Sequence, residues 1–327
     1  TARVEPGCVQ ATLQAAARPH GLRFGPDPSS WTRATMGGLI GNNACGPHAT
    51  AWGRTSDNVL AMDVVTGSGT RLDASRGAQA LDVVPGLADL VTTHLSPIRT
   101  EFARFSRQVS GYAMEHLLPE HGTDLARFLV GSEGTLATTL GATVRLVPVA
   151  SAPVLVALGY PSMAAAADAV PAILAHHPLA VEGMDARLVD VVRRHKGPGA
   201  VPPLPDGEGW LLVEMDATSG LGGARSLAPR AVPDAVVARA AEAAARAAED
   251  AVAALDDTAR TNLALAAAHA MARDAGTEAV AVYPPGSDAA ALWRIRADGA
   301  GLGGRTPRGT QGWPGWEDAA VPPASLG

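Results

Sequence analysis

The chain has 327 residues, of which 47% are hydrophobic and 18% charged, and its formal net charge is −6. This length and balance predict two globular domains with real cores and exclude a disordered or membrane-embedded chain. The negative charge argues against nucleic acid as a partner, because phosphate binding needs a basic face.

The cysteine content and the length of the apolar runs further limit the class of protein. The only two cysteines, Cys8 and Cys45, are too few for a four-cysteine zinc or iron–sulfur site. A disulfide between them is possible, but we expect reduced thiols in a cytoplasmic protein, with peripheral attachment to the inner membrane as the alternative. No apolar run reaches the roughly 20 residues of a membrane-spanning helix, and no signal peptide opens the chain.

The first 150 residues alternate short predicted strands and helices. A strand should end at Pro6-Gly7, and apolar residues at helical spacing predict a helix over 9–21. Residues 59–66 and 70–73 read as a hairpin around Gly67-Ser68-Gly69, which is no nucleotide loop because the rest of a GxGxxG motif is absent. Further helices are expected over residues 87–95 and 98–105, with a break at Pro97, and over 114–118; a strand should follow over 143–149.

Between the first helix and the hairpin, residues 26–57 are unusually dense in turn formers. Five glycines allow a positive φ or a close backbone approach, and three prolines fix φ. Short polar side chains between them can bond to backbone or ligand at small entropic cost. Such a run is typical of a segment that wraps a flat, polar ligand; an ordinary Ω-loop is the structural alternative.

A boundary at residues 151–153 separates a second predicted pattern of alternating strands and helices. Strands are expected at 154–160, 179–184, 210–217 and 279–285, and helices at 162–177, 185–195, about 231–273 and 287–301. Pro171 should kink the first of these helices, while Asp185 and Ser287 should cap two others. Strand–helix–strand passes of this kind predict a ferredoxin-like α+β unit.

Four sequence blocks then carry a resemblance to a known family. In order they are PDPSS at 26–30, ATMGGLIGNNACG at 34–46, WGRTSDNVLAMDVVTGSG at 52–69, and SGY with GSEGTLATTLGATVRL within 110–146. Together they resemble the FAD-linked oxidases, which share the flavin fold of vanillyl-alcohol oxidase and p-cresol methylhydroxylase. The most similar branch holds glycolate oxidase subunits, D-lactate dehydrogenases and D-2-hydroxyglutarate dehydrogenases.

The resemblance implies a fold, a cofactor and a set of contacts. It implies an α+β chain with a PCMH-type FAD-binding domain over residues 1–150 and a ferredoxin-like substrate (cap) domain over 151–327, both partial. Backbone N–H groups can meet the dinucleotide's pyrophosphate in place of lysines. By resemblance the FAD-lining residues are Asp27, Ser29, Thr35, Gly37, Gly38, Asn42, Asn43, Gly46, Gly53, Gly134, Ala137 and Thr138; the family more often has glycine where Ala137 stands.

Arg296, in LWRIRAD, is the candidate catalytic residue. Its position resembles the arginine of the family's WxxR helix, which holds the substrate carboxylate, and a guanidinium matches a carboxylate bidentately. An arginine on a solvated helix face is the alternative interpretation.

Several other polar residues have simpler, structural interpretations. Cys45 is interpreted as a small buried residue, His48 as a loop histidine bonded to backbone, and His116 and His121 as too poorly spaced for a metal, so no metal site is expected. His176 and His177 should satisfy carbonyls at a helix end. Glu182 and Asp185 resemble a pattern that faces the flavin, but a strand end and a helix cap explain them equally well.

Two family features are absent from these residues. The RGGGTS-like loop of the first flavin subdomain is not found, and neither are the histidine cluster and catalytic histidine near the family's C-terminus. We therefore expect an internal fragment with the second flavin subdomain present and the first missing. The sequence leaves open whether the fragment binds FAD by itself.

The function implied is FAD-dependent oxidation of a D-2-hydroxy acid of the lactate, 2-hydroxyglutarate or glycolate type, by hydride transfer to flavin N5. Electrons would pass on to a quinone, a cytochrome or an iron–sulfur domain. Two alternatives stay open: a sugar-lactone oxidase or flavin-dependent synthase of the same fold, and a non-catalytic remnant.

Overall fold

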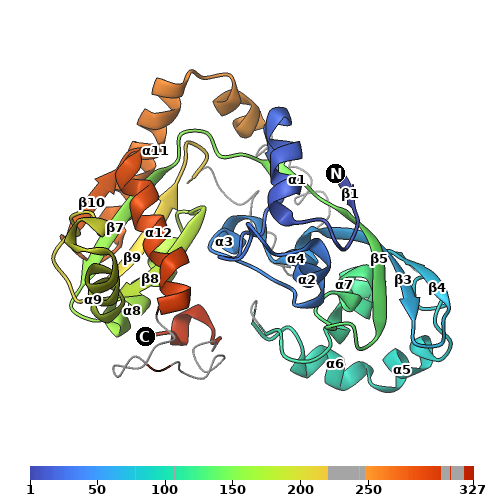
Figure 1. The fold of residues 1–327 in the computed structure, drawn as a ribbon. Helices are drawn as coiled ribbons and strands as arrows, with labels where there is room; N and C mark the ends of the chain where they lie inside the picture. The colour runs from blue at the N-terminus through green and yellow to red at the C-terminus, as the bar shows by residue number, and fades with distance from the viewer. Residues whose placement is uncertain (78, 106–107, 220–242, 244–246, 303–309, 311–319) are drawn as a thin grey trace. The chain divides into compact units, whose positions relative to one another are not determined.

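The computed structural model describes all residues except 78, 106–107, 220–242, 244–246, 303–309 and 311–319. The chain divides into two compact units, unit 1 over Thr1–Val149 and unit 2 over Ala150–Gly327 (Figure 1). The first part of the predicted helix over 231–273 lies largely outside the described residues.

Unit 1 is built on a four-stranded antiparallel sheet with strand order β1-β5-β3-β4. Its strands are β1 (Ala2–Val4), β3 (Val59–Thr66), β4 (Arg71–Ala74) and β5 (Ala137–Val144). The predicted hairpin is confirmed as β3–β4. The predicted strand over 143–149 is wrong in its bounds: β5 begins at Ala137, and the later residues form β6 (Val147–Pro148), which pairs instead with β2 (Leu22–Arg23).

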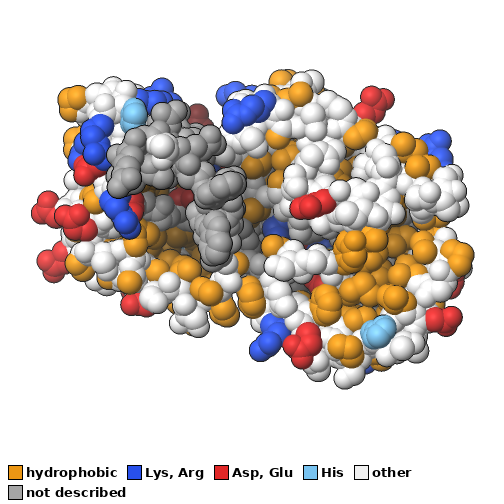
Figure 2. All heavy atoms as spheres, turned by 60° about the horizontal axis from the view of Figure 1, so that its bottom comes forward, with side chains coloured by type: hydrophobic (Ala, Val, Ile, Leu, Met, Phe, Trp, Pro, Cys, Tyr) orange, Lys and Arg blue, Asp and Glu red, His pale blue; other side chains and the backbone are white. Residues whose placement is uncertain are grey.

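Short helices cover this sheet and enclose one core. They are α1 (Gln10–Ala17), α2 (Met36–Gly41), α3 (Ala49–Trp52), α4 (Thr55–Asn58), α5 (Leu87–Thr93), α6 (Leu95–Glu101) and α7 (Leu125–Leu129), with 3₁₀ turns at Arg18–His20, Met114–Leu117 and Pro119–His121. Phe24, Met36, Ile40 and Leu125 are completely buried in the core. Other hydrophobic side chains remain exposed, and Figure 2 shows many of them gathered on one face of this unit.

The break between α5 and α6 falls at His94, not at the predicted Pro97. Pro97 lies in the first turn of α6, where its missing N–H would have had no partner within the helix. The predicted helix over 114–118 is a 3₁₀ turn that ends at Leu117.

Unit 2 is a sandwich of two helix pairs around an antiparallel sheet. The strands are β7 (Val154–Tyr160), β8 (Ala180–Asp185), β9 (Gly209–Met215) and β10 (Val280–Tyr283), in the order β10-β7-β9-β8. This is the strand order of a ferredoxin-like sheet, with two parallel strands separated by a third that is antiparallel to both.

Alternation along β7 explains how unit 2 builds two cores. Val156 and Leu158 pack on one face against α8 (Met163–Leu174) and α11 (Asp257–Asp274). Leu155 and Ala157 pack on the other against α9 (Ala186–Lys196) and α12 (Ser287–Leu302). Further 3₁₀ turns lie at Pro198–Ala200 and Pro323–Ser325.

The helix termini of unit 2 follow the sequence in part. Asp185 caps α9 as predicted, accepting the Leu188 N–H at 2.8 Å. Ser287, predicted as a cap, is the first residue inside α12. The helix α8 continues through Pro171 as one element.

Candidate functional site

The polar stretch 26–57 of unit 1 is organised around α2. Thr35 begins the helix, and its hydroxyl accepts the Gly38 N–H at 3.3 Å. Met36 and Ile40 anchor the helix in the core. Gly37 faces the turn after β1: its N–H donates to the Pro6 carbonyl at 2.8 Å, and a Cβ there would lie 2.8 Å from Pro6 Cβ. Close packing therefore requires Gly37 whether or not a ligand is bound.

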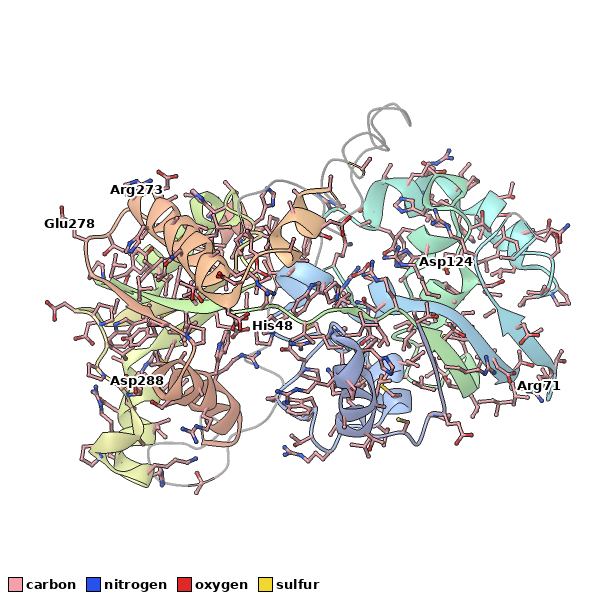
Figure 3. The ribbon with its side chains drawn as sticks, turned by 90° about the horizontal axis from the view of Figure 1, so that it is seen from above. His48, Arg71, Asp124, Arg273, Glu278 and Asp288 are labelled. Carbon is pink, nitrogen blue, oxygen red and sulfur yellow. The ribbon has the colours of Figure 1, made fainter. Side chains whose placement is uncertain are left out.

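A second group forms where the chain returns past Asp27. The Asp27 carboxylate accepts the His48 N–H at 3.2 Å, pairs with His48 Nδ1, and lies 3.2 Å from the Arg23 guanidinium. The His48 ring stacks on Trp52 with centroids 5.0 Å apart; Figure 3 labels His48. Gly46 lies so close that a Cβ would be 2.4 Å from the Asp27 carbonyl oxygen. Sequence reasoning missed the Asp27–His48 pair, because residues so far apart carry no spacing signal.

Stability should depend on pH through Asp27. Burial raises the pKa of this carboxyl, but the charges of His48 and Arg23 and the hydrogen bonds from His48 lower it more, so the net shift is downward. A depressed folded-state pKa stabilises the fold above the unfolded value of about 3.9, and this stabilisation is lost as the pH falls through the folded value. We expect Asp27→Asn to be destabilising at pH 7, by an amount that shrinks below about pH 4.

Urea unfolding midpoints between pH 7 and pH 3 measure this effect. The exposed Asp82 supplies a control, Asp82→Asn, which should leave the midpoints unchanged. A destabilisation by Asp27→Asn that is the same at every pH would contradict the assignment.

The glycine blocks before and after the β3–β4 hairpin meet at the end of α2. The Gly131 N–H donates to the Ile40 carbonyl at 2.9 Å, and the Glu133 N–H donates to the Gly41 carbonyl at 3.0 Å. Gly134 has a φ of +76° in the same turn, which favours glycine. Two blocks remote in sequence thus form one surface.

Asparagines and the residues after the turn occupy the margins of this surface. Asn43 has a φ of +47°, and its Oδ1 accepts the Ser56 N–H at 2.9 Å. Asn42 is exposed at the end of α2, and Ser29 is half-buried in the turn over residues 29–33. Ala137 and Thr138 begin β5, where they pair with Thr66 and Val65 of β3.

Behind this surface, Asp57 joins three segments. Its carboxylate accepts the Arg54 N–H at 2.9 Å and pairs with Arg127 of α7. Gly53 has a φ of +75°, and a Cβ there would lie 2.7 Å from Asp57 Cβ. Only 8% of the Asp57 side chain is exposed, so this ion pair is largely shielded from water.

Two histidines, His116 and His121, lie near this network. Burial lowers the pKa of His116 to about 3, with the Arg127 and Arg54 charges acting in the same direction, so the ring is neutral at neutral pH. Burial also raises the pKa of Glu115. The His116 and His121 rings are 6.5 Å apart, and within the described part of the chain no group of three or more potential metal ligands occurs.

Unit 2 contains the candidate Arg296. Its Nε donates to Glu182 Oε2 at 2.6 Å, and Trp293 Nε1 donates to Glu214 Oε2 at 2.9 Å. As predicted, His176 and His177 satisfy carbonyls at the end of α8: their backbone N–H groups donate to the Ile173 and Leu174 carbonyls at 3.1 Å. The His176 ring in addition places Nε2 2.7 Å from Asp274 Oδ2 of α11. Cys8 and Cys45 do not form a disulfide with each other.

The residues of unit 1 fit a flavin dinucleotide. At Gly134 a Cβ would meet nothing within 4 Å, and at Gly41 the nearest atom would be 3.8 Å away, so the backbone is open where the two blocks meet. The buried Ser56 Oγ has no hydrogen-bond partner among the described residues. Open glycine backbone and neutral polar groups suit a ligand that is flat in one part and anionic in another.

Comparisons with known proteins agree with this chemistry. Residues 1–75 match the FAD binding domain profile, and residues 150–327 match that of the FAD linked oxidases, C-terminal domain. The chain is 32% identical over 200 residues to a D-2-hydroxyglutarate dehydrogenase of Pseudomonas putida, covering 57% of this chain and 20% of that protein. It is 29% identical to glycolate oxidase subunit GlcD of Bacillus subtilis, covering 66% of this chain and 38% of that subunit, and 29% identical to a D-lactate dehydrogenase of Archaeoglobus fulgidus, covering 64% and 39%.

The chain thus matches between about a fifth and two fifths of the length of these relatives. Among solved structures, an alkyldihydroxyacetonephosphate synthase is 14% identical, covers 90% of this chain and 41% of its own, and has a TM-score of 0.47. In the described residues, no helix has the length and apolarity to cross a membrane. The family profile covers more than half of the chain, in the unit that carries Arg296. The chain belongs to the FAD-linked oxidases, a family of mixed helix-and-sheet fold whose cofactor is FAD.

Proposed function

We propose that the protein to which this chain belongs oxidises a D-2-hydroxy acid of the lactate, 2-hydroxyglutarate or glycolate type. The names of the relatives support this substrate class. When bound, FAD supplies the acceptor for the substrate's α-hydride at N5. The observation that carries the proposal is Arg296, whose side chain is one-third exposed and can bind a carboxylate.

The assignment of the two units to subdomains of the family is part of the same proposal. Unit 1 corresponds to the second subdomain of a PCMH-type FAD domain over residues 1–150, and unit 2 to the substrate cap over 151–327. The meeting of the two glycine blocks and the ferredoxin-like strand order support these assignments. Electrons leave to a quinone, a cytochrome or an iron–sulfur domain.

The residues of this chain bind and orient. The FAD-lining set is the one identified by resemblance, which already includes Gly134, and Gly41 adds further open backbone beside it. Arg296 holds the substrate carboxylate, which fixes the hydroxyl-bearing carbon in one orientation. No observation favours the sugar-lactone oxidase or the flavin-dependent synthase over this function.

Spectroscopy and one variant pair test the proposal. The purified protein should show a flavin absorbance band at about 450 nm, as flavoproteins do. In the absence of oxygen, D-lactate, D-2-hydroxyglutarate or glycolate should bleach this band. Arg296→Ala should keep the band and slow bleaching by about 100-fold or more, because a charge-assisted bidentate contact is lost. The matched control is Arg294→Ala on the same helix, whose side chain is exposed. Unchanged bleaching by Arg296→Ala would overturn the carboxylate contact.

A further inference from the structure

The ion pair between Glu182 and Arg296 joins an edge strand to a helix. Glu182 lies on β8 and Arg296 on α12, which runs beside the sheet of unit 2 in Figure 1. The Nε–Oε2 distance is 2.6 Å, and 21% of the Glu182 side chain and 33% of the Arg296 side chain are exposed. One turn earlier, the Trp293–Glu214 hydrogen bond ties α12 to β9. The helix is therefore fixed on the sheet on both sides of Ile295, which is buried.

This pair uses only one edge of the guanidinium. Arginine has five N–H donors in a planar fork, and Glu182 takes the one at Nε. Among the residues that the structure describes, Nη1 and Nη2 of Arg296 form no hydrogen bond. The two terminal nitrogens still present parallel N–H groups, the arrangement that binds a carboxylate bidentately.

We propose that Glu182 is a positioning residue, which holds Arg296 through Nε so that the Nη1–Nη2 edge receives the carboxylate of the substrate. The inference rests on the proposed function of Arg296 and extends it. A free arginine side chain samples many rotamers, and an ion pair that selects one of them before the ligand arrives reduces the entropy lost on binding.

A competing role for Glu182 predicts the opposite effect of its removal on carboxylate binding. If the glutamate were only a resident counter-ion, the substrate carboxylate would have to displace it, and removing its charge would tighten binding. The geometry favours positioning, because the hydrogen bond to Glu182 is made by Nε and not by the terminal nitrogens. With Glu182 in place the pair is neutral, so recognition depends on hydrogen-bond geometry more than on net charge.

Three variants at two positions separate these roles. Glu182→Ala removes the contact, and Glu182→Gln keeps an oxygen that can accept from Nε. The control, Glu278→Gln, changes an exposed glutamate of the same unit, which points outward in Figure 3. Calorimetry with oxalate, which the flavin cannot oxidise, reports carboxylate binding; KM and kcat are measured with the hydroxy acid that bleaches the flavin.

We expect Glu182→Ala to weaken oxalate binding and raise KM by about tenfold with little change in kcat, because one charge-assisted hydrogen bond positions a group that binds ground state and transition state alike. Glu182→Gln should lose no more than about threefold, since a neutral acceptor remains, and Glu278→Gln should match the wild type. Unchanged or tighter binding by Glu182→Ala, or tighter binding by Glu182→Gln, overturns the proposal. Melting temperatures identify any variant that fails to fold; if Glu182→Ala fails to fold, Glu182→Gln decides alone, because the counter-ion role predicts that it binds oxalate more tightly than the wild type. Failure of the proposed function shows separately, as oxalate binding that survives Arg296→Ala.

Discussion

Gly46→Ala should destabilise unit 1 and abolish flavin binding. A Cβ at this position would lie 2.4 Å from the Asp27 carbonyl oxygen and 2.5 Å from its carbon, and both are backbone atoms that no rotamer change can move. Overpacking of this kind costs about 1–3 kcal/mol, and the upper end applies because the contact is to main chain. The displaced loop also carries His48, whose pairing with Asp27 would be lost.

Thermal unfolding and the flavin absorbance band measure the two effects. A loss of about 2 kcal/mol corresponds to a melting temperature lower by about 4–8 °C in a unit of this size. Gly41→Ala is the matched control for the stability measurement alone, because the nearest atom to its Cβ would be 3.8 Å away and the residue lies in a helix. Its stability should stay equal or rise slightly. If Gly46→Ala bound flavin as tightly as the wild type, the close approach to Asp27 would not be essential to the site.

Asp57→Ala should have the largest effect on stability of any single substitution considered. It would leave the guanidinium of Arg127 without its carboxylate and the Arg54 N–H without its acceptor, in a place that is mostly shielded from water. Removing one partner of such a pair costs about 3–5 kcal/mol, because the remaining charge stays desolvated. Urea unfolding should therefore show a much lower midpoint.

A second substitution tests the cause of this loss. Adding Arg127→Met to Asp57→Ala removes the stranded charge, so the double variant should be more stable than Asp57→Ala alone. Asp73→Ala, at an exposed position on β4, is the control and should change stability by less than about 0.5 kcal/mol. A double variant no more stable than Asp57→Ala would show that the ion pair is not the source of the effect.

Local patterns in the sequence were sufficient for the elements that depend on local chemistry. The β3–β4 hairpin follows from alternation around a glycine turn, and the Asp185 cap from a short acidic side chain ahead of a helical pattern. The predicted bounds of a strand were wrong where pairing with a neighbouring strand determines them. The strand β5 begins at Ala137 because it pairs with β3 along its full length, and nothing in its own residues reports that partner.

The same distinction between local and long-range features applies to the candidate site. Glycine and asparagine content identified the stretch around α2, and resemblance supplied the FAD-lining residues, whose contacts with FAD stay a prediction. The pairs Asp27–His48, Asp57–Arg127 and Glu182–Arg296 were not foreseen as pairs, because each joins residues far apart in the chain. Only the fold brings such side chains together, and a single sequence contains no signal that predicts these long-range pairs.

The docking of the turn at 131–135 on α2 also has a consequence for how this unit folds. Both hydrogen bonds that make it, from Gly131 to Ile40 and from Glu133 to Gly41, join residues more than 90 positions apart in the chain and use main-chain atoms alone. Closing so long a loop costs entropy before its contacts repay it, which places such contacts late in folding. The open glycine surface therefore exists only once the rest of the unit is assembled. A ligand held there stabilises the finished unit and does not template its formation.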